Sequence, residues 1–337
     1  MSKELEIQVI ELSGSSQQIG FKQGTKRRLT ENDHAMLKMQ KHINIEEAFN
    51  NLRKYDKEMV YELTGLAKGL QISSEEATRL YGGYDVAMPF MGCSAFGNDS
   101  FYVRNYDFST KLYDAQFVLL NPDKGYASAG FSQQLTGRLD GMNEKGLVAG
   151  IHLVHERKQP KRFLPTTIAR LVLNNCSTVQ EAVDLIMSVP HGHCLNFSLT
   201  DQNGNCAIVE ASPEKQISNE TSPLLCTNHF ETNSLRKYNR PLIKNSQLRK
   251  QFLSQISKEH LKPIDAYHAF NHSSSPLFLR DYKNFFGTLH TVVYSPRDLR
   301  IIIGVGEHCV PCIISFKDWL DGNVQLPKFI KGNINPL

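Results

Sequence analysis

The pattern of apolar and polar positions changes near residue 92. Residues 6–12 alternate as a β-strand does, and apolar side chains between residues 31 and 70 recur at three- and four-residue steps, which predicts helices. After Gly92 the dominant period is two, and alternating runs are separated by turn sequences such as Asp201-Gln202-Asn203-Gly204. The first ninety residues are therefore expected to form one strand followed by helices, and strands are expected to dominate the rest.

The second part of the chain predicts strands and helices in alternating blocks. Strands are expected over 93–97, 101–106, 115–120, 125–131, 135–142 and 147–154, then helices over 166–174 and 177–187. More strands follow over 195–200, 205–210 and 224–227, then helices over 246–256 and 263–271, and a hairpin over 288–295 and 299–304. Two antiparallel sheets with helices on their outer faces would bury all these apolar faces. The sequence therefore predicts an α+β fold, a four-layer αββα sandwich with a helical N-terminal segment.

Composition and charge narrow the classes of function. The chain has 337 residues and a net charge of +4, with Lys and Arg spread along it. The densest basic patch, residues 157–162, lies between a strand and a helix and is interpreted as a solvated loop, not a nucleic-acid site. No run approaches the roughly 18–20 apolar residues of a membrane span, and the first residues contain no apolar signal region. We therefore expect a protein with no nucleic-acid partner and no membrane span.

Cysteine usage indicates a reducing compartment. The chain has seven cysteines, an odd number without the spacing of a small disulfide scaffold, which together with the missing signal region predicts reduced thiols in the cytoplasm. Cys309 and Cys312 form a single CxxC pair, whereas structural zinc requires four ligands. We interpret this pair as structural and expect no metal.

The candidate chemistry lies just after the change of pattern. A glycine precedes Cys93, and the turn residues 98–100 separate two alternating runs, so a hairpin would bring Arg104 and Asp107 near the thiol. Arg104 would favour the thiolate, and Asp107 would hold an amine. The alternative is that Cys93 is a small buried apolar residue and that Arg104 and Asp107 form a surface pair.

Further motifs of note lie along most of the chain. In chain order they are Gly20 with Gln23-Gly24, Glu62 with Gly65-Leu66-Ala67-Lys68-Gly69, Gly92-Cys93-Ser94, Arg104-Asn105-Tyr106-Asp107, Met142-Asn143-Glu144-Lys145-Gly146-Leu147 with Ala149-Gly150, Asp201 with Gly204, Val209-Glu210-Ala211-Ser212-Pro213, Thr227-Asn228-His229-Phe230 and Thr288-Leu289-His290-Thr291-Val292-Val293. With these motifs in this order the chain resembles the acyl-coenzyme A:6-aminopenicillanic acid acyltransferase family of N-terminal nucleophile (Ntn) hydrolases. It is similar, more distantly, to choloylglycine (bile-salt) hydrolases and acid ceramidase.

The resemblance implies a cofactor-free enzyme that cuts its own chain between Gly92 and Cys93. Residues 1–92 would become a small chain and residues 93–337 the catalytic core, and the two would stay associated as one globular unit. A homo-oligomer is compatible with this organisation. The α-amine released on Cys93 has an ordinary pKa of about 7.7–8.0, so much of it is neutral at working pH and can act as a base.

The resemblance also assigns roles to residues that match the family motifs. Cys93 would be both nucleophile and base, Arg104 would raise the acidity of the thiol, and Asp107 would orient the α-ammonium. Asn228 would donate its amide to the oxyanion of the tetrahedral intermediate. The alternatives are a structural ion pair for Arg104 and Asp107, and an Asx turn for Asn228.

Two positions depart from the pattern of the distant relatives. His152 stands where bile-salt hydrolases have an asparagine, so it lines the acyl pocket or is an ordinary strand histidine. Thr288, which we place in the substrate pocket, stands where those relatives have a late arginine, and the candidates to replace that arginine are Arg280, Arg240 and Arg249. His229, which adjoins Asn228, is interpreted as structural or as part of the substrate pocket.

The leading hypothesis is a self-processing hydrolase or acyltransferase that forms a thioester on Cys93. Its substrates would be small linear amides, either N-acyl amines or N-acyl amino acids, and water or an amine would accept the acyl group. One rival is a Cys–His amidase of the papain type that acts without self-cleavage. The other is a non-catalytic binding protein that retains the fold.

Overall fold

The computed structural model describes residues 3–156, 159–284 and 286–335. Among these residues, ten strands form the first of two sheets. The path runs through β11 (Gln216–Glu220), β10 (Cys206–Ala211), β9 (Cys194–Thr200), β8 (Val148–His155), β7 (Asp140–Asn143), β5 (Ser128–Gln133), β4 (Gln116–Pro122), β1 (Lys3–Gly14) and β17 (Phe329–Ile334), and β6 (Gly137–Arg138) pairs with β5. The pairing of β1 with β4 is parallel, which departs from the expected antiparallel sheet. Parallel neighbours need a long crossover, and the helices, β2 and β3 between β1 and β4 supply it.

Seven strands of the described ranges form the second sheet, which holds the predicted hairpin. Its path is β12 (Leu224–Cys226), β2 (Gly92–Gly97), β3 (Tyr102–Phe108), β14 (Phe286–Ser295), β15 (Arg300–Val305) and β16 (Cys312–Ser315), and β13 (Arg280–Asp281) pairs with β14. The turn between β2 and β3 is held by Asn98, whose Oδ1 accepts hydrogen bonds from the backbone N–H groups of Ser100 and Phe101. The register places Gly92 opposite Asp107 and Cys93 opposite Tyr106.

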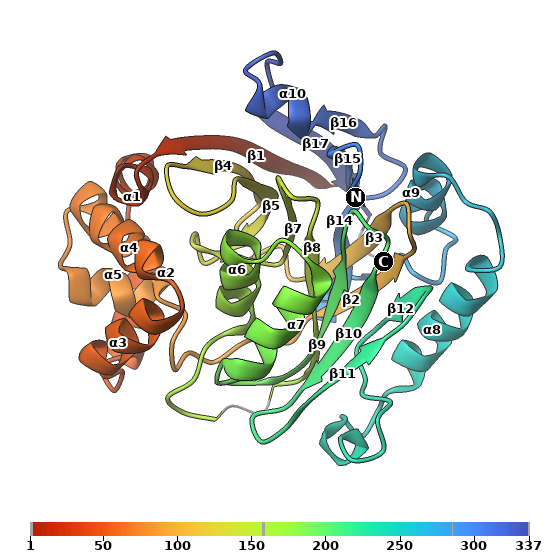
Figure 1. The fold of residues 1–337 in the computed structure, drawn as a ribbon, viewed down its shortest axis with the longest axis horizontal. Coiled ribbons are helices and arrows are strands. Elements are labelled where there is room, and N and C mark those ends of the chain that lie inside the picture. The colour runs from red at the N-terminus through yellow and green to blue at the C-terminus, as the bar shows by residue number, and fades with distance from the viewer. Residues whose placement is uncertain (1–2, 157–158, 285, 336–337) are drawn as a thin grey trace.

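Two helix pairs cover the outer faces of the sheets. Helices α6 (Pro165–Asn175) and α7 (Val179–Ser188) contact strands of the first sheet. Helices α8 (Lys244–Ile256) and α9 (Pro263–Asn271) contact β2, β3 and β14 of the second sheet. Figure 1 shows the two pairs on opposite sides of the strands. The predicted αββα sandwich is confirmed.

The N-terminal segment is helical after β1, as predicted. Its helices are α1 (Ser16–Thr25), α2 (Glu31–Met39), α3 (Ile45–Tyr55), α4 (Lys57–Leu70) and α5 (Ser74–Tyr81), which form the group at the left of Figure 1. Helices α1 and α4 cross so closely that a Cβ added to Gly20 would lie 1.9 Å from the carbonyl oxygen of Glu62. Glycine is therefore required at this crossing.

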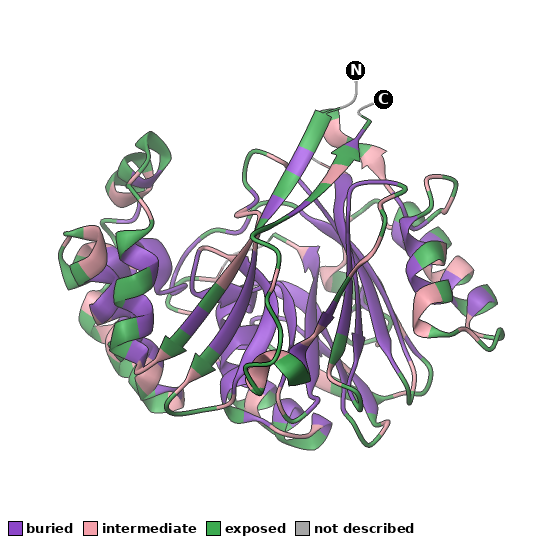
Figure 2. Cartoon of the chain, turned by 90° about the horizontal axis from the view of Figure 1, so that it is seen from above, coloured by how far each residue is buried: buried purple, intermediate pink, exposed green. Residues whose placement is uncertain are grey.

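The N-terminal segment shares its core with the sandwich. Strand β1 lies inside the first sheet, and Glu62 of α4 accepts a hydrogen bond of 2.8 Å from Arg170 of α6, both side chains being buried. Figure 2 shows that the buried residues follow the strands and the inward faces of the helices. Residues 3–92 are thus integrated into the fold, and the existence of residues 1–92 as a separate chain stays a prediction.

The elements that the sequence did not predict lie mostly at the ends and edges. They are β11, β13, β16, β17, the short helix α10 (Phe316–Leu320) and the 3₁₀ turns η1 (Arg236–Tyr238) and η2 (Tyr282–Asn284). Strand β11 carries an exposed polar sequence that lacks an alternating apolar face, so pairing with β10 defines it instead. In the basic patch at 157–162, residues 157 and 158 lie outside the described residues. No helix of the described ranges is both long and apolar enough to cross a membrane.

Candidate active site

Cys93 lies near the start of β2 with its side chain fully buried. Its neighbour in the register is Tyr106, and Ala95 on the same face is opposite Arg104. Because cross-strand partners share a face, Arg104 reaches the thiol, and its Nη2 donates to the Cys93 sulfur at 2.9 Å. The hairpin therefore places a guanidinium beside the thiol.

Arg104 and Asp107 both act electrostatically on the Cys93 thiol, but they belong to different faces of β3. They are three residues apart on one strand, and side chains at that spacing point to opposite faces. Arg104 instead pairs with Asp140 of β7, whose Oδ2 lies 2.5 Å from its Nη1, and both side chains are fully buried. The structural ion pair between Arg104 and Asp107 is thereby excluded.

The Asp140 carboxylate is held by a buried network. It accepts a hydrogen bond of 2.6 Å from Tyr294 and lies 3.4 Å from His290 Nε2, while His290 Nδ1 lies 2.7 Å from the hydroxyl of Tyr113. Burial raises the pKa of Asp140, but Arg104 and the hydrogen bonds from His290 and Tyr294 bring it below its ordinary value. A charged carboxylate therefore fixes Arg104 behind the thiol.

Asp107 projects to the other face of β3 and is oriented by Thr288. The Thr288 hydroxyl donates to Oδ1 of Asp107 at 2.6 Å and accepts the backbone N–H of Leu279 at 2.8 Å. Oδ2 of Asp107 is buried and has no hydrogen-bond partner among the described residues. Burial raises the pKa of Asp107, and Arg249 and the Thr288 hydrogen bond oppose that effect. One carboxylate oxygen is thus available for a further donor.

Asn228 follows β12 and contacts the nitrogen of Cys93. The Cys93 backbone N–H donates to Oδ1 of Asn228 at 2.9 Å, and Nδ2 of Asn228 donates to the carbonyl of Leu153 at 2.9 Å. The side-chain oxygen therefore holds the nitrogen that scission would turn into an α-amine.

Arg249 of α8 is the late arginine that contacts the site. Its Nη1 donates to the carbonyl of Cys93 at 2.6 Å and to the hydroxyl of Ser94 at 2.7 Å, and its Nη2 donates to Oδ1 of Asn228 at 2.8 Å. Sequence reasoning weighed Arg249 only as one of three candidates, because residues 156 positions apart carry no local signal of their contact. Arg240 and Arg280 line the same cavity as Arg249, but they pair with Glu156 and Glu307 respectively.

His152 and His229 form hydrogen bonds with groups other than the Cys93 thiol. His152 Nε2 lies 2.8 Å from the hydroxyl of Ser198, and His229 Nδ1 lies 2.8 Å from the hydroxyl of Ser246. Burial, together with Arg104 and Arg249, lowers the pKa of His152 well below its ordinary value, so this ring is neutral. The hydrogen bond to the Cys93 sulfur comes from Arg104, and neither of these two rings has one to it among the described residues.

The thiol itself is neutral in the intact chain. Burial raises the pKa of Cys93 to about 11, although Arg104 and its hydrogen bond act in the opposite direction. Sequence reasoning anticipated the acidifying effect of Arg104, but the removal of the sulfur from water outweighs it.

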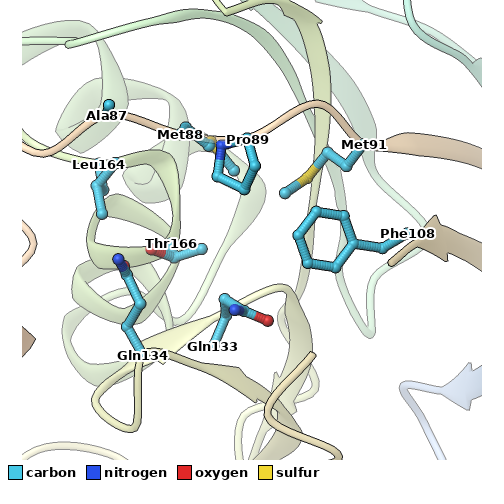
Figure 3. Close-up of a pocket in the computed structure, with 9 residues that line it drawn as sticks. All are labelled: Ala87, Met88, Pro89, Met91, Phe108, Gln133, Gln134, Leu164 and Thr166. Atoms are coloured by element: carbon cyan, nitrogen blue, oxygen red, sulfur yellow. The ribbon is translucent and has the colours of Figure 1, made fainter. Parts of the chain in front are cut away.

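Residues 82–91 connect α5 to β2, and we call them the connecting segment. This segment contributes to the walls of two cavity systems near the site. One is a small apolar cavity with Met88, Met91 and Phe108 in its wall, and Figure 3 shows Met91 and Phe108 together at one end. It adjoins a cavity of about 690 Å³ that extends to α2 and α5. The other, of about 380 Å³, has Asn228 and Arg249 in its wall. Among the described residues, no group of three or more His, Cys, Asp or Glu side chains is placed to hold a metal ion.

The fold is that of Ntn-type amide hydrolases and acyltransferases, an αββα sandwich built on two sheets that are mostly antiparallel. A family model described as acyl-coenzyme A:6-aminopenicillanic acid acyl-transferase matches residues 95–308. The chain belongs to this family, and the resemblance drawn from its motifs is confirmed.

Several solved structures are similar to this chain at low sequence identity. Penicillin V acylase from Agrobacterium tumefaciens is 18% identical, with a TM-score of 0.44 over 67% of this chain and 86% of its own. A mutant of conjugated bile acid hydrolase from Clostridium perfringens is 15% identical, with a TM-score of 0.49 over 73% and 97%. An N-acylethanolamine-hydrolyzing acid amidase orthologue from Caenorhabditis elegans is 11% identical, with a TM-score of 0.42 over 61% and 93%. No curated protein matches the chain.

Proposed function

We propose that this protein cuts its own chain between Gly92 and Cys93 and then hydrolyses or transfers the acyl group of small linear amides through a thioester on Cys93. The observation that carries the proposal is that two side chains contact the two reacting atoms of Cys93. Arg104 holds the sulfur of Cys93 and Asn228 holds its nitrogen, at 2.9 Å each. An Ntn cysteine needs both atoms, one as nucleophile and one as base.

The residue before the scissile bond supports self-cleavage. A Cβ added to Gly92 would lie 2.5 Å from the ring of Phe286, so a larger residue would displace that ring. In the cleavage step the sulfur adds to the Gly92 carbonyl carbon, the C–N bond to Cys93 breaks, and the nitrogen takes the thiol proton. Water then cleaves the thioester, leaving a carboxylate on Gly92 and a free thiol on Cys93.

Each later turnover would use the released amine as the base. A thiol with a raised pKa needs a nearby proton acceptor, and an α-amine on the same residue is held at short range. The amine takes the thiol proton, sulfur forms a C–S bond to the acyl carbon, and the C–N bond of the substrate breaks as its nitrogen receives that proton. Water or a second amine then attacks the thioester, which releases the acyl product and restores the thiol.

The surrounding residues have separate roles in this scheme. Asp107, with one free oxygen, orients the α-ammonium, and Arg104 stabilises negative charge on the sulfur. Asn228 supplies the amide donor for the oxyanion, a kind of contact typically worth about 3 kcal/mol. Arg249 donates to both Asn228 and the carbonyl of Cys93, and so fixes the position of Asn228 relative to Cys93.

The experiment is an intact-mass measurement of the purified wild type beside Cys93→Ala. We expect two wild-type fragments, the larger beginning at Cys93, and one uncut chain for the variant. Cys226→Ala is the matched control, because Cys226 is also a buried cysteine and lies on the neighbouring strand β12. A wild type that stays full-length yet hydrolyses amides would exclude the α-amine as base, and a full-length inactive wild type would favour a binding protein.

A further inference from the structure

The cavity of about 380 Å³ is lined by two residues that contact Cys93, although the buried Cys93 side chain is not part of its wall. Its wall includes Phe90, Asn228, Arg240, Arg249, Arg280 and Phe286. Asn228 and Arg249 contact the nitrogen and the carbonyl of Cys93 respectively, so a group bound in the cavity would lie next to the thioester.

The wall of this cavity carries an excess of positive charge. It contains three arginines and one acidic residue, Asp281, whose oxygens accept the amide of Asn284. Arg249 donates hydrogen bonds to neutral oxygens of Cys93, Ser94, Asn228 and Asn245. Arg280 is paired with the buried carboxylate of Glu307. Arg240 differs from Arg249 because more of its hydrogen-bond donors lack a partner in the described part of the protein.

Arg240 has donor capacity that the protein does not use. Its Nε lies 3.3 Å from the carboxylate of Glu156, which is itself half exposed to solvent. Its Nη2 is buried and has no hydrogen-bond partner among the described residues. Burial lowers the pKa of Arg240 to about 10, and Glu156 acts in the opposite direction.

In the intact chain Phe90 covers this guanidinium. The Arg240 Cζ lies 3.6 Å from the centre of the Phe90 ring, and that ring lies 5.0 Å from the ring of Phe286. Phe90 is two residues before the scissile bond, so cleavage after Gly92 frees the end of the connecting segment that carries it. Scission would thereby expose an unsatisfied arginine beside the new N-terminus.

The cavity on the other side of the connecting segment has a different character. Its wall combines apolar side chains such as Met36, Leu80 and Leu112 with charged ones such as Arg27, Asp33 and Asp114, and its mainly apolar part is the small adjoining cavity lined by Met88, Met91 and Phe108. The connecting segment thus contributes residues both to a mainly apolar cavity and to a cationic one. An acyl chain matches the first, and a planar carboxylate matches the fork of guanidinium donors in the second.

Resting on the function proposed above, we infer that the substrates are N-acyl amino acids whose carboxylate is bound by Arg240. Arg240 is then a specificity-determining residue, and the acyl chain lies on the side of Met88 and Met91. An amide with an uncharged amine half would leave the Nη2 donors of Arg240 unsatisfied, as they are now.

The test compares N-decanoylglycine with N-decanoylethanolamine, which share an acyl chain and differ by a carboxylate against a hydroxymethyl group. The processed wild type should favour the glycine conjugate in kcat/KM. Arg240→Gln should raise KM for that substrate about tenfold, as expected for a lost charge-assisted hydrogen bond, with a much smaller change for the ethanolamide. Arg240→Lys, which keeps the charge, should recover part of the loss.

Arg236→Gln is the control, because it removes an exposed arginine of the same segment that does not line the cavity. Thermal unfolding and intact mass verify that each variant is folded and processed. Equal turnover of the two substrates by the wild type, or an equal rise of both KM values in Arg240→Gln, would overturn the inference and leave the amidase function standing. A chain that stays full-length and cleaves neither amide would overturn the amidase function and the inference with it.

Discussion

Arg104 and Asp107, three residues apart on β3, act on different faces of the same strand. Arg104 reaches the Cys93 sulfur at 2.9 Å, whereas Asp107 receives the Thr288 hydroxyl at 2.6 Å on the opposite side. The pleat of one strand thus separates the group that supports the thiol from the group proposed to hold the amine. The two can be altered independently.

Thr288→Val should shift the pH dependence of activity. The hydroxyl of Thr288 lowers the pKa of Asp107, which burial raises, so its removal lets that pKa rise further. In the proposed mechanism Asp107 must be ionised to hold the α-ammonium, so activity should fall as pH drops through the pKa of Asp107. The acid limb of the profile should therefore move to higher pH, with a loss of about tenfold in kcat near neutrality.

Thr291→Val is the control for this experiment. Thr291 is a buried threonine of the same strand, but its hydroxyl donates to Asn105. An identical displacement of the acid limb in both variants would show that the effect is a general loss of buried hydroxyls.

Arg104 and Arg249 should differ in their effect on stability. In a Cys93→Ala background, Arg104→Met leaves the buried Asp140 without its cation and should cost about 3–5 kcal/mol of unfolding free energy. Arg249→Met leaves only neutral acceptors without a donor and should cost about 1–3 kcal/mol. Urea unfolding measures both. A larger cost for Arg249 would mean that Asp107 depends on it for charge compensation.

The thiol of Cys93 should become reactive only after scission. In the intact chain it is fully buried with its pKa raised to about 11, so iodoacetamide near pH 7.5 should leave it unmodified. Peptide mapping by mass spectrometry should find Cys93 alkylated in the 93–337 fragment and unmodified in uncut chain. Alkylation of Cys309, which is partly exposed, should be found in both species and verifies that the reagent is active.

The two fragments should stay together after cleavage. Residues 3–14 form a strand within the first sheet, and Glu62 is buried in an ion pair with Arg170, so separation would expose core from both parts. Gel filtration without denaturant should yield one peak containing both fragments. Glu62→Gln should destabilise this complex by about 3 kcal/mol or more.

Glu75→Gln provides the comparison for Glu62→Gln. Glu75 pairs with Arg79 at 3.9 Å on the exposed side of α5, and the loss of such a surface pair should stay within about 0.5 kcal/mol. Fragments that elute separately in the wild type would contradict the shared core.

Much of the architecture could be predicted from the chain because the relevant signals are local. The hairpin of β2 and β3 rests on alternation around the Asn98 turn, and the helices rest on their own periodicity and caps. The single long helical pattern over residues 31–70 was resolved by the structure into α2, α3 and α4, each with a polar residue at its start. Edge strands such as β11 lacked any local signal, since pairing alone defines them.

The order of residues in the chain was enough to identify the family and to propose Gly92 and Cys93 as the place of the chemistry. Only the tertiary structure decided that Arg104 pairs with Asp140 instead of Asp107, and that Arg249 reaches the carbonyl of Cys93. Contacts of this kind depend on strand register and on a helix packed across the sheet, which no short stretch of sequence encodes. The neutral thiol has the same origin, because desolvation is the sum of everything packed around the sulfur.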